Sequence, residues 1–224
     1  NPLIIHCSDP GQLEFLVRPW PDDVQTLMDR FWPGPLTLVL PKQPGVPLVT
    51  TGGLATAAVR IPDHPVALEL LRLTNLPIAA PSANVSGRPS PTRAEHVYQD
   101  LDGRIAAIVD AGPTGWGVES TVLDCTERPF RLLRPGGVTL EALRESVSVT
   151  ADSGVAGPAE GPVRSPGMKY RHYAPECRVT VVVGEHAQKA ITRWAAADLA
   201  DGHVVGIMAF SEHLNGYGGI PTLY

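Results

Sequence analysis

The 224-residue sequence predicts an α/β fold in which strands and helices alternate along the chain. Short runs of apolar and β-branched residues alternate with segments whose apolar residues recur at helical spacing. Polar or cationic side chains stand where the predicted strands end, and open α/β sheets bind ligands at such ends. These side chains are His6, Arg60, Ser82, Asn84, Ser120 and Arg134. The pattern predicts one site to which several strands contribute.

The composition is that of a globular protein, with 43% hydrophobic and 18% charged residues. A net charge of −5 gives no global basic field that would attract nucleic acid. No apolar run approaches the roughly 18 residues that a membrane-spanning helix needs. The first residues also lack the features of a signal peptide. We therefore expect no membrane association and a cytoplasmic location.

The three cysteines, Cys7, Cys125 and Cys177, lie far apart in the sequence. They form no Cys-x-x-Cys pair, and no histidine spacing completes a zinc site. We expect buried free thiols in a reducing compartment.

The first predicted strand, 3–5, delivers His6 to its end. A lone histidine there suits a structural role as well as a functional one. The segment from Pro21 to 31 has apolar residues at i, i+3, i+4 and i+7, which predicts an amphipathic helix that ends at Pro33. Residues 36–40 form the next predicted strand.

Residues 56–62 predict a strand that carries Arg60 near its end. A guanidinium on an apolar strand needs an anion or several carbonyls around it. A structural salt bridge and a ligand carboxylate or phosphate both satisfy this requirement. We expect Asp63 to cap the following helix, which ends at Asn75 before a strand at 78–80.

The stretch APSANVSGRPSPT, residues 80–92, connects this strand to the next predicted helix, 93–101. If the backbone is extended, Ser82, Asn84 and Ser86 share one face and present two hydroxyls and an amide. Thr92 with Glu95 fits a capping box. A polar loop before a helix N-terminus suits an anionic ligand, whereas a capped surface loop is the alternative on composition alone.

Later strands are predicted at 105–109, around Ser120, and at 130–134 up to Arg134, and Thr139 caps a further helix. The glycine-rich segment 112–117 is neither a dinucleotide fingerprint nor a P-loop. The sequence contains no nucleophile elbow and no clustered carboxylate pair. The predicted site consists of neutral donors and arginines, which recognise and polarise an anion.

We expect two domains joined by a linker. Residues 1–147 would form the first domain, and 148–176, where helical and strand periodicity is lost, the linker. From Cys177, a predicted strand, an alanine-rich helix at 186–199 and a strand at 203–210 indicate a partial α/β domain over 177–224.

Seven segments together resemble one known family, the threonylcarbamoyl-AMP synthases of the YrdC type in their longer, two-domain form. These segments are NPLIIH (1–6), FWPGPLTLVL (31–40), TAAVRIP (56–62), APSANVSGRPSPT (80–92), GVESTVLD (117–124), LLRPGG (132–137) and SPGMKYRHYAP (165–175). The resemblance implies a twisted mixed open sheet of the YrdC type, a linker that acts as a lid, and a small Rossmann-like β-α-β unit. It also implies a basic strand upstream of Asn1 and a longer C-terminal domain, so we expect a fragment truncated at both ends.

The resemblance implies a nucleotidyltransferase that forms threonylcarbamoyl-AMP and pyrophosphate from L-threonine, bicarbonate and ATP. The product would supply the machinery that transfers the threonylcarbamoyl group to tRNA, and direct tRNA binding is left open. Matched positions would bind threonine through His6, Arg60, Ser82 and Ser120. Other matched positions would bind ATP through Thr56, Asn84, Thr92, Arg134 and Tyr173. Mg2+ is expected with ATP, but no carboxylate cluster identifies its protein ligands. Catalysis is expected to be positional, with no catalytic residue that takes part in the chemical step.

Two alternatives remain from other functional classes. A non-catalytic RNA-binding protein of the same fold would show a steeply salt-dependent tRNA affinity without ATP. A carbamoyl-transferring relative would release phosphate and not pyrophosphate.

Overall fold

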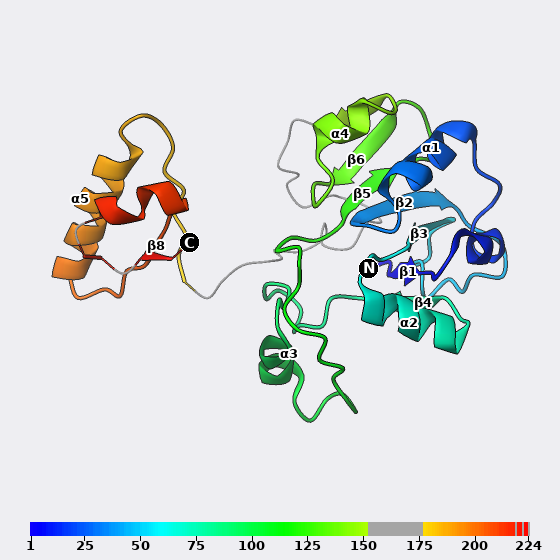
Figure 1. The fold of residues 1–224 in the computed structure, drawn as a ribbon, viewed down its shortest axis with the longest axis horizontal. Coiled ribbons are helices and arrows are strands. Elements are labelled where there is room, and N and C mark those ends of the chain that lie inside the picture. The colour runs from blue at the N-terminus through cyan, green and yellow to red at the C-terminus, as the bar shows by residue number, and fades with distance from the viewer. Residues whose placement is uncertain (152–176, 218, 221, 224) are drawn as a thin grey trace. The chain divides into compact units, whose positions relative to one another are not determined.

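A computed structural model of the chain describes residues 1–151, 177–217, 219–220 and 222–223. The chain divides into two compact units, Asn1–Ala174 and Pro175–Tyr224 (Figure 1). The predicted tyrosine of the linker, Tyr173, lies outside the described residues. None of the helices among these residues is long and apolar enough to cross a membrane.

The first unit is built on a mixed seven-stranded sheet with the strand order β4-β1-β3-β2-β5-β6-β7 (Figure 1). Its strands are β1 (Ile4–His6), β2 (Leu36–Pro41), β3 (Thr56–Arg60), β4 (Ile78–Ala80), β5 (Thr121–Asp124), β6 (Phe130–Arg134) and β7 (Val149–Ala151). Its helices are η1 (Pro10–Phe15), α1 (Asp22–Phe31), α2 (Pro65–Thr74), α3 (Ala94–Leu101) and α4 (Leu140–Arg144). The pairs β1–β3, β2–β5 and β6–β7 are parallel, and the pairs β1–β4, β2–β3 and β5–β6 are antiparallel. The predicted mixed α/β sheet is confirmed.

The main core lies on one face of this sheet. Because side chains alternate along a strand, Leu36, Leu38 and Leu40 of β2 point into the main cluster, while Val39 points into a smaller cluster on the other face. Helix α1 contributes its predicted apolar stripe, including Leu27, to the main cluster. Burial of β2 on both faces explains why its sequence, LTLVLP, is apolar at nearly every position and not alternating.

Three local predictions were wrong. Residues 105–109 do not form a strand. Helix α2 is capped by His64, whose Nδ1 accepts a hydrogen bond from the Val66 N–H at 3.3 Å, and not by Asp63. The capping box at α3 does not form, because its N-cap is Arg93 and the Thr92 N–H donates to His96 Nδ1. By contrast, Asn75 ends α2 in the left-handed conformation as expected.

Strand β7 pairs with β6, so the sheet continues to Ala151, a few residues past the expected domain end at 147.

In the second unit the expected helix is α5 (Ala187–Ala200). The predicted strand after Cys177 is not present, and a short parallel pair, β8 (Ile207–Met208) with β9 (Thr222–Leu223), takes the place of the predicted β-α-β arrangement. A 3-10 helix, η2 (Ser211–Gly216), lies between the paired strands in the sequence.

The cysteines are free, but only two are buried as expected, because Cys177 is exposed. Loss of solvation, followed by the charge of Asp9, raises the pKa of the Cys7 thiol to about 12. Burial likewise raises the pKa of Cys125. Both buried thiols are therefore protonated and unreactive at neutral pH.

Candidate functional site

One end of the sheet collects four of the predicted site residues, which are His6, Arg60, Ser120 and Arg134. His6 and Arg60 are direct partners in the parallel pair β1–β3, so their side chains leave the sheet on the same face. Ser120 immediately precedes β5, and its Oγ lies 2.8 Å from Thr37 Oγ1 at the start of β2. The sheet topology therefore brings together side chains that are far apart in the sequence.

Arg60 is half-buried and only partly neutralised by its surroundings. Its Nε donates to the Gly34 carbonyl at 2.8 Å. Within the described residues, its two Nη groups donate no hydrogen bond to the protein. Burial lowers the pKa of Arg60, and Arg134 lowers it further, whereas Asp63 opposes the shift. The two Nη groups of Arg60 can thus donate two parallel hydrogen bonds to a carboxylate.

Arg134 contacts the backbone and the hydroxyl of Ser120. Its Nη2 donates to the Ser120 carbonyl at 2.8 Å and to the Ser120 Oγ at 3.1 Å, and its Nε donates to the same carbonyl at 3.1 Å. Ser120 is only 4% exposed. The arginine therefore fixes the serine, and two guanidinium groups stand close enough to repel each other. Such a pair favours an anion between or beside them.

His6 is neutral at physiological pH. Loss of solvation, and then the charge of Arg60, lowers the pKa of His6 to about 4, although hydrogen bonds to the backbone at Ile78 and Ile4 act the other way. A neutral imidazole can orient a polar ligand without adding a third positive charge to this end of the sheet.

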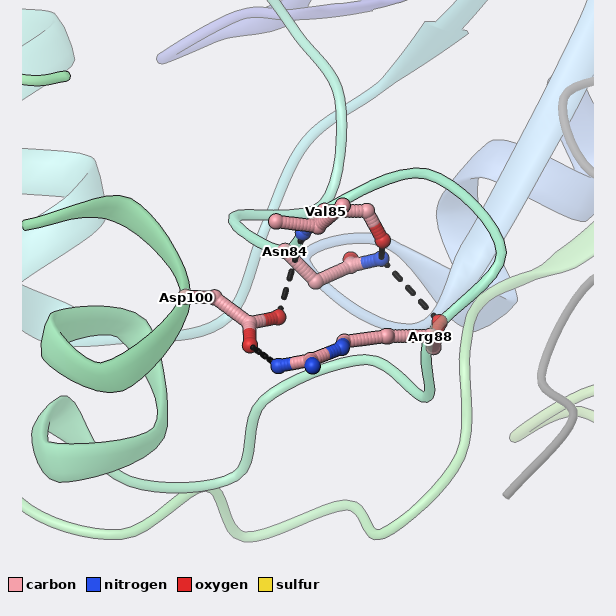
Figure 2. Close-up of polar contacts among 4 residues, drawn as sticks. All are labelled: Asn84, Val85, Arg88 and Asp100. Carbon is pink, nitrogen blue, oxygen red and sulfur yellow. Dashed lines mark hydrogen bonds and ion pairs between the residues drawn. The ribbon is translucent and has the colours of Figure 1, made fainter. Parts of the chain in front are cut away.

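The loop after β4 adopts a turn and not the predicted extended array. The Arg88 N–H donates to the Val85 carbonyl at 3.1 Å, and Gly87 has a φ of 95°, as the third residue of a type II turn requires. Asn84 Nδ2 donates to the Val85 carbonyl at 2.9 Å and to the Arg88 carbonyl at 3.1 Å (Figure 2). The amide nitrogen that was predicted to face a ligand therefore holds the loop together.

The end of this loop approaches Ser120. Ser90 Oγ donates to Glu119 Oε1 at 2.7 Å, and the Thr114 N–H donates to the Thr92 carbonyl at 2.9 Å. Both contacts join the loop to the segment that enters β5. Thr92 is thereby connected to the Ser120 end of the sheet through the segment 114–119.

Two predicted residues, Thr56 and Ser82, do not lie at the end of the sheet that carries Arg60. Thr56 begins β3 four residues before Arg60, about 13 Å away along an extended strand. Ser82 is exposed and follows β4, which runs antiparallel to β1, so the chain leaves the sheet at the end opposite His6.

Sequence reasoning missed three residues around the site. Thr37 is a buried hydroxyl within an otherwise apolar strand, and this departure from the pattern was a usable signal. Glu119 holds the loop through Ser90. Trp116 is 48% exposed, and its Nε1 donates to Asp63 Oδ2 at 3.4 Å. The contacts of Glu119 and Trp116 are long-range and carry no local sequence signature.

The described residues contain no group of three histidine, cysteine or acidic side chains that could hold a metal ion. They do not fit a Mg2+ site made by protein ligands alone.

Two family models cover almost the whole chain. The family described as "Telomere recombination" (Sua5, YciO and YrdC) matches residues 1–136, and the family described as "Threonylcarbamoyl-AMP synthase, C-terminal domain" matches residues 138–221. The chain belongs to the Sua5/YciO/YrdC family. The predicted resemblance is confirmed.

Members of this family with curated names include two threonylcarbamoyl-AMP synthases that match nearly all of this chain. The protein from Bacillus subtilis is 51% identical over 97% of the chain, and that from Pyrococcus abyssi is 50% identical over 95%. These matches span 62% and 64% of the two relatives. The chain thus covers a little under two thirds of the length of these proteins.

Solved structures of family members show the same fold. The crystal structure of P. abyssi Sua5 complexed with L-threonine has a TM-score of 0.89 and 47% identity, and the match covers 100% of this chain and 66% of that one. Escherichia coli YciO, at 21% identity and a TM-score of 0.58 over 64% of this chain and 69% of that one, shares the fold.

Proposed function

We propose that this chain carries the substrate site of an L-threonylcarbamoyladenylate synthase. The enzyme would convert L-threonine, bicarbonate and ATP into threonylcarbamoyl-AMP, pyrophosphate and water. The observation that carries the proposal is about 50% identity, across nearly the whole chain, to two proteins named threonylcarbamoyl-AMP synthase. The cationic sheet end with its neutral donors supports it, because two of the three substrates carry negative charge and the third is a zwitterion.

In this proposal the threonine carboxylate lies against Arg60. The Nε of Arg60 binds the Gly34 carbonyl, and within the described residues its Nη groups donate no hydrogen bond to the protein. Neutral His6, on the neighbouring strand, and the hydroxyl of Ser120 would orient the polar groups of threonine. Ser82 would join them only if its exposed loop segment folds toward this end when threonine binds. The structure of P. abyssi Sua5 with L-threonine supports this class of ligand.

The nucleotide would lie at the same end of the sheet, on the side that carries Arg134. Arg134 provides a positive charge for the polyphosphate, and Thr92 approaches this side through the 114–119 segment. Asn84 and the linker residue Tyr173 are proposed to complete the nucleotide contacts. Thr56 is also proposed to contact the nucleotide, although it lies at the end of β3 opposite Arg60. Mg2+, when present, would be carried by the phosphates of ATP.

The proposed chemistry is positional. The threonine amine and bicarbonate form a carbamate with loss of water, and a carbamate oxygen attacks the α-phosphorus of ATP. The bond from that phosphorus to the β,γ-pyrophosphate breaks, and pyrophosphate leaves. Arginines that are already in place lower the repulsion between the carbamate and the phosphates, and proximity provides much of the rate. The product would then pass to the machinery that transfers threonylcarbamoyl to tRNA.

Binding measurements on two arginine variants test the two halves of this site. By isothermal titration calorimetry, we expect Arg60→Ala to weaken L-threonine binding about 10- to 100-fold, the range for losing a hydrogen-bonded charge. Arg134→Ala should weaken ATP binding by a similar factor. Arg131→Ala is the matched control, because this exposed arginine lies on the same strand as Arg134. If wild type binds L-threonine and neither site variant changes either affinity, the proposed site is wrong.

A further inference from the structure

Asp100, in the last turn of α3, holds both ends of the turn after β4. Its Oδ2 accepts a hydrogen bond from the Val85 N–H at 3.1 Å, and its Oδ1 accepts from Arg88 Nη1 at 2.6 Å (Figure 2). The side chain of Asp100 is only 11% exposed, whereas that of Arg88 is 50% exposed. One carboxylate therefore joins the first and last residues of the turn to a helix.

The turn is also closed from inside by Asn84, whose Nδ2 bridges the Val85 and Arg88 carbonyls. Among the described residues, Asn84 Oδ1 is a buried side-chain oxygen that has no hydrogen-bond partner. Exchanging the amide oxygen and nitrogen would set the oxygen against two carbonyls, so the orientation is fixed. The turn thus contains one buried acceptor without a partner among the described residues, on the residue next to Val85, whose N–H Asp100 binds.

We propose that Asp100 is a positioning residue that holds residues 84–88 in the conformation that receives the nucleotide. This inference rests on the proposed function, because it assigns the loop to ATP. The physical reason is preorganisation. A glycine-containing loop loses much conformational freedom when it orders around a ligand, and a carboxylate that already fixes both ends of the turn removes part of that loss.

The charge of Asp100 supports this role. The hydrogen bond from Arg88, followed by that from the Val85 N–H, lowers the pKa of Asp100. The carboxylate is therefore ionised at neutral pH and accepts both hydrogen bonds at once.

The test compares Asp100→Ala with Asp102→Ala in the 224-residue chain. Asp102 is an exposed carboxylate two residues further on, so its removal changes the net charge equally without removing the contacts of Asp100 with the turn. We measure the affinities for ATP and L-threonine by calorimetry, the thermal midpoint, and amide hydrogen exchange at Val85. Asp100→Ala should weaken ATP binding about tenfold, leave L-threonine binding within twofold and accelerate exchange at Val85. Asp102→Ala should change none of these.

Asp100→Asn provides the conservative comparison. It keeps an oxygen for the Val85 N–H but loses the charge that pairs with Arg88, so its ATP affinity should fall between those of wild type and Asp100→Ala. Unchanged ATP affinity in Asp100→Ala would overturn the inference, and so would an equal loss for both ligands together with a lower thermal midpoint. If neither the 224-residue wild type nor the same chain preceded by the basic segment that the family resemblance implies binds ATP, the proposed function has failed. The positioning role is then decided by exchange at Val85, where equal rates in wild type and Asp100→Ala overturn it.

Discussion

At the scale of single residues, the proposed substrate site depends on two guanidinium groups at one end of the sheet. Arg60 and Arg134 each donate to a backbone carbonyl, at Gly34 and Ser120, so each has one side fixed by the fold. Their mutual repulsion contributes to the lowered pKa of Arg60. An arriving anion relieves that repulsion, and we infer that this relief is the source of affinity for a carboxylate or phosphate.

His6 gives a pH-dependent stability that can be measured. Its pKa is lowered from 6.5 to about 4 in the folded protein, so the unfolded state binds the proton first as the pH falls. Its contribution to stability is complete above pH 6.5 and is lost progressively down to about pH 4. We expect the free energy of unfolding of wild type to fall over this range by about 2–3 kcal/mol more than that of His6→Gln.

Urea unfolding of both proteins at pH 7, 5.5 and 4.5 measures this difference. Parallel pH profiles for the two proteins would show that His6 is not held neutral by burial and by Arg60.

At the scale of elements, the approach of β6 to β5 aligns Ser120 with Arg134. The backbone just after β6 comes so close to β5 that a Cβ at Gly136 would lie within 2.5 Å of the Ser120 carbonyl carbon and the Thr121 nitrogen. Only glycine fits this contact. The position of Ser120 therefore depends on the lack of a side chain at Gly136.

Replacing Gly136 by alanine should displace the start of β5. We expect Gly136→Ala to lower the free energy of unfolding by about 1–3 kcal/mol, as overpacking does, and to weaken L-threonine binding as well. Gly115→Ala is the control, because a Cβ there meets no atom within 4 Å. Denaturant unfolding and calorimetry measure the two effects. Equal stability of the two variants would contradict this role of Gly136.

Local patterns predicted elements best where burial is complete. The continuous apolar run of β2 and the helical stripe of α1 both occur in the structure because each contributes to the main core. The apolar run at 105–109 did not become a strand, and Ile105 and Val109 are 41% and 74% exposed. A strand needs a partner edge as well as β propensity, and pairing is not encoded locally.

The site was predicted in part for the same reason. His6, Arg60, Ser120 and Arg134 were identified because each is a polar residue at the end of an apolar run. The conformation of residues 84–88 was not predicted, because it depends on Asp100, fifteen residues beyond Val85, as well as on Gly87. Contacts between distant residues, such as Ser90 with Glu119, leave no trace in a local pattern.

At the scale of the whole molecule, the chain comprises a large sheet unit, which carries the proposed substrate site, and a second unit with its own small core around Ala195, Ile207 and Tyr217. Family models match both parts, and the chain spans a little under two thirds of the length of the B. subtilis and P. abyssi relatives. The proposed substrate-binding residues that the structure describes all lie in the sheet unit.

The most direct test of this account is pyrophosphate release from ATP as a function of L-threonine and bicarbonate. It should be measured on the 224-residue chain and on the same chain preceded by the basic segment that the family resemblance implies. We expect pyrophosphate release that requires both L-threonine and bicarbonate, in the longer chain at least. Arg60→Ala should reduce this release at least tenfold. Release of phosphate in place of pyrophosphate, or no dependence on threonine in either chain, would contradict the account.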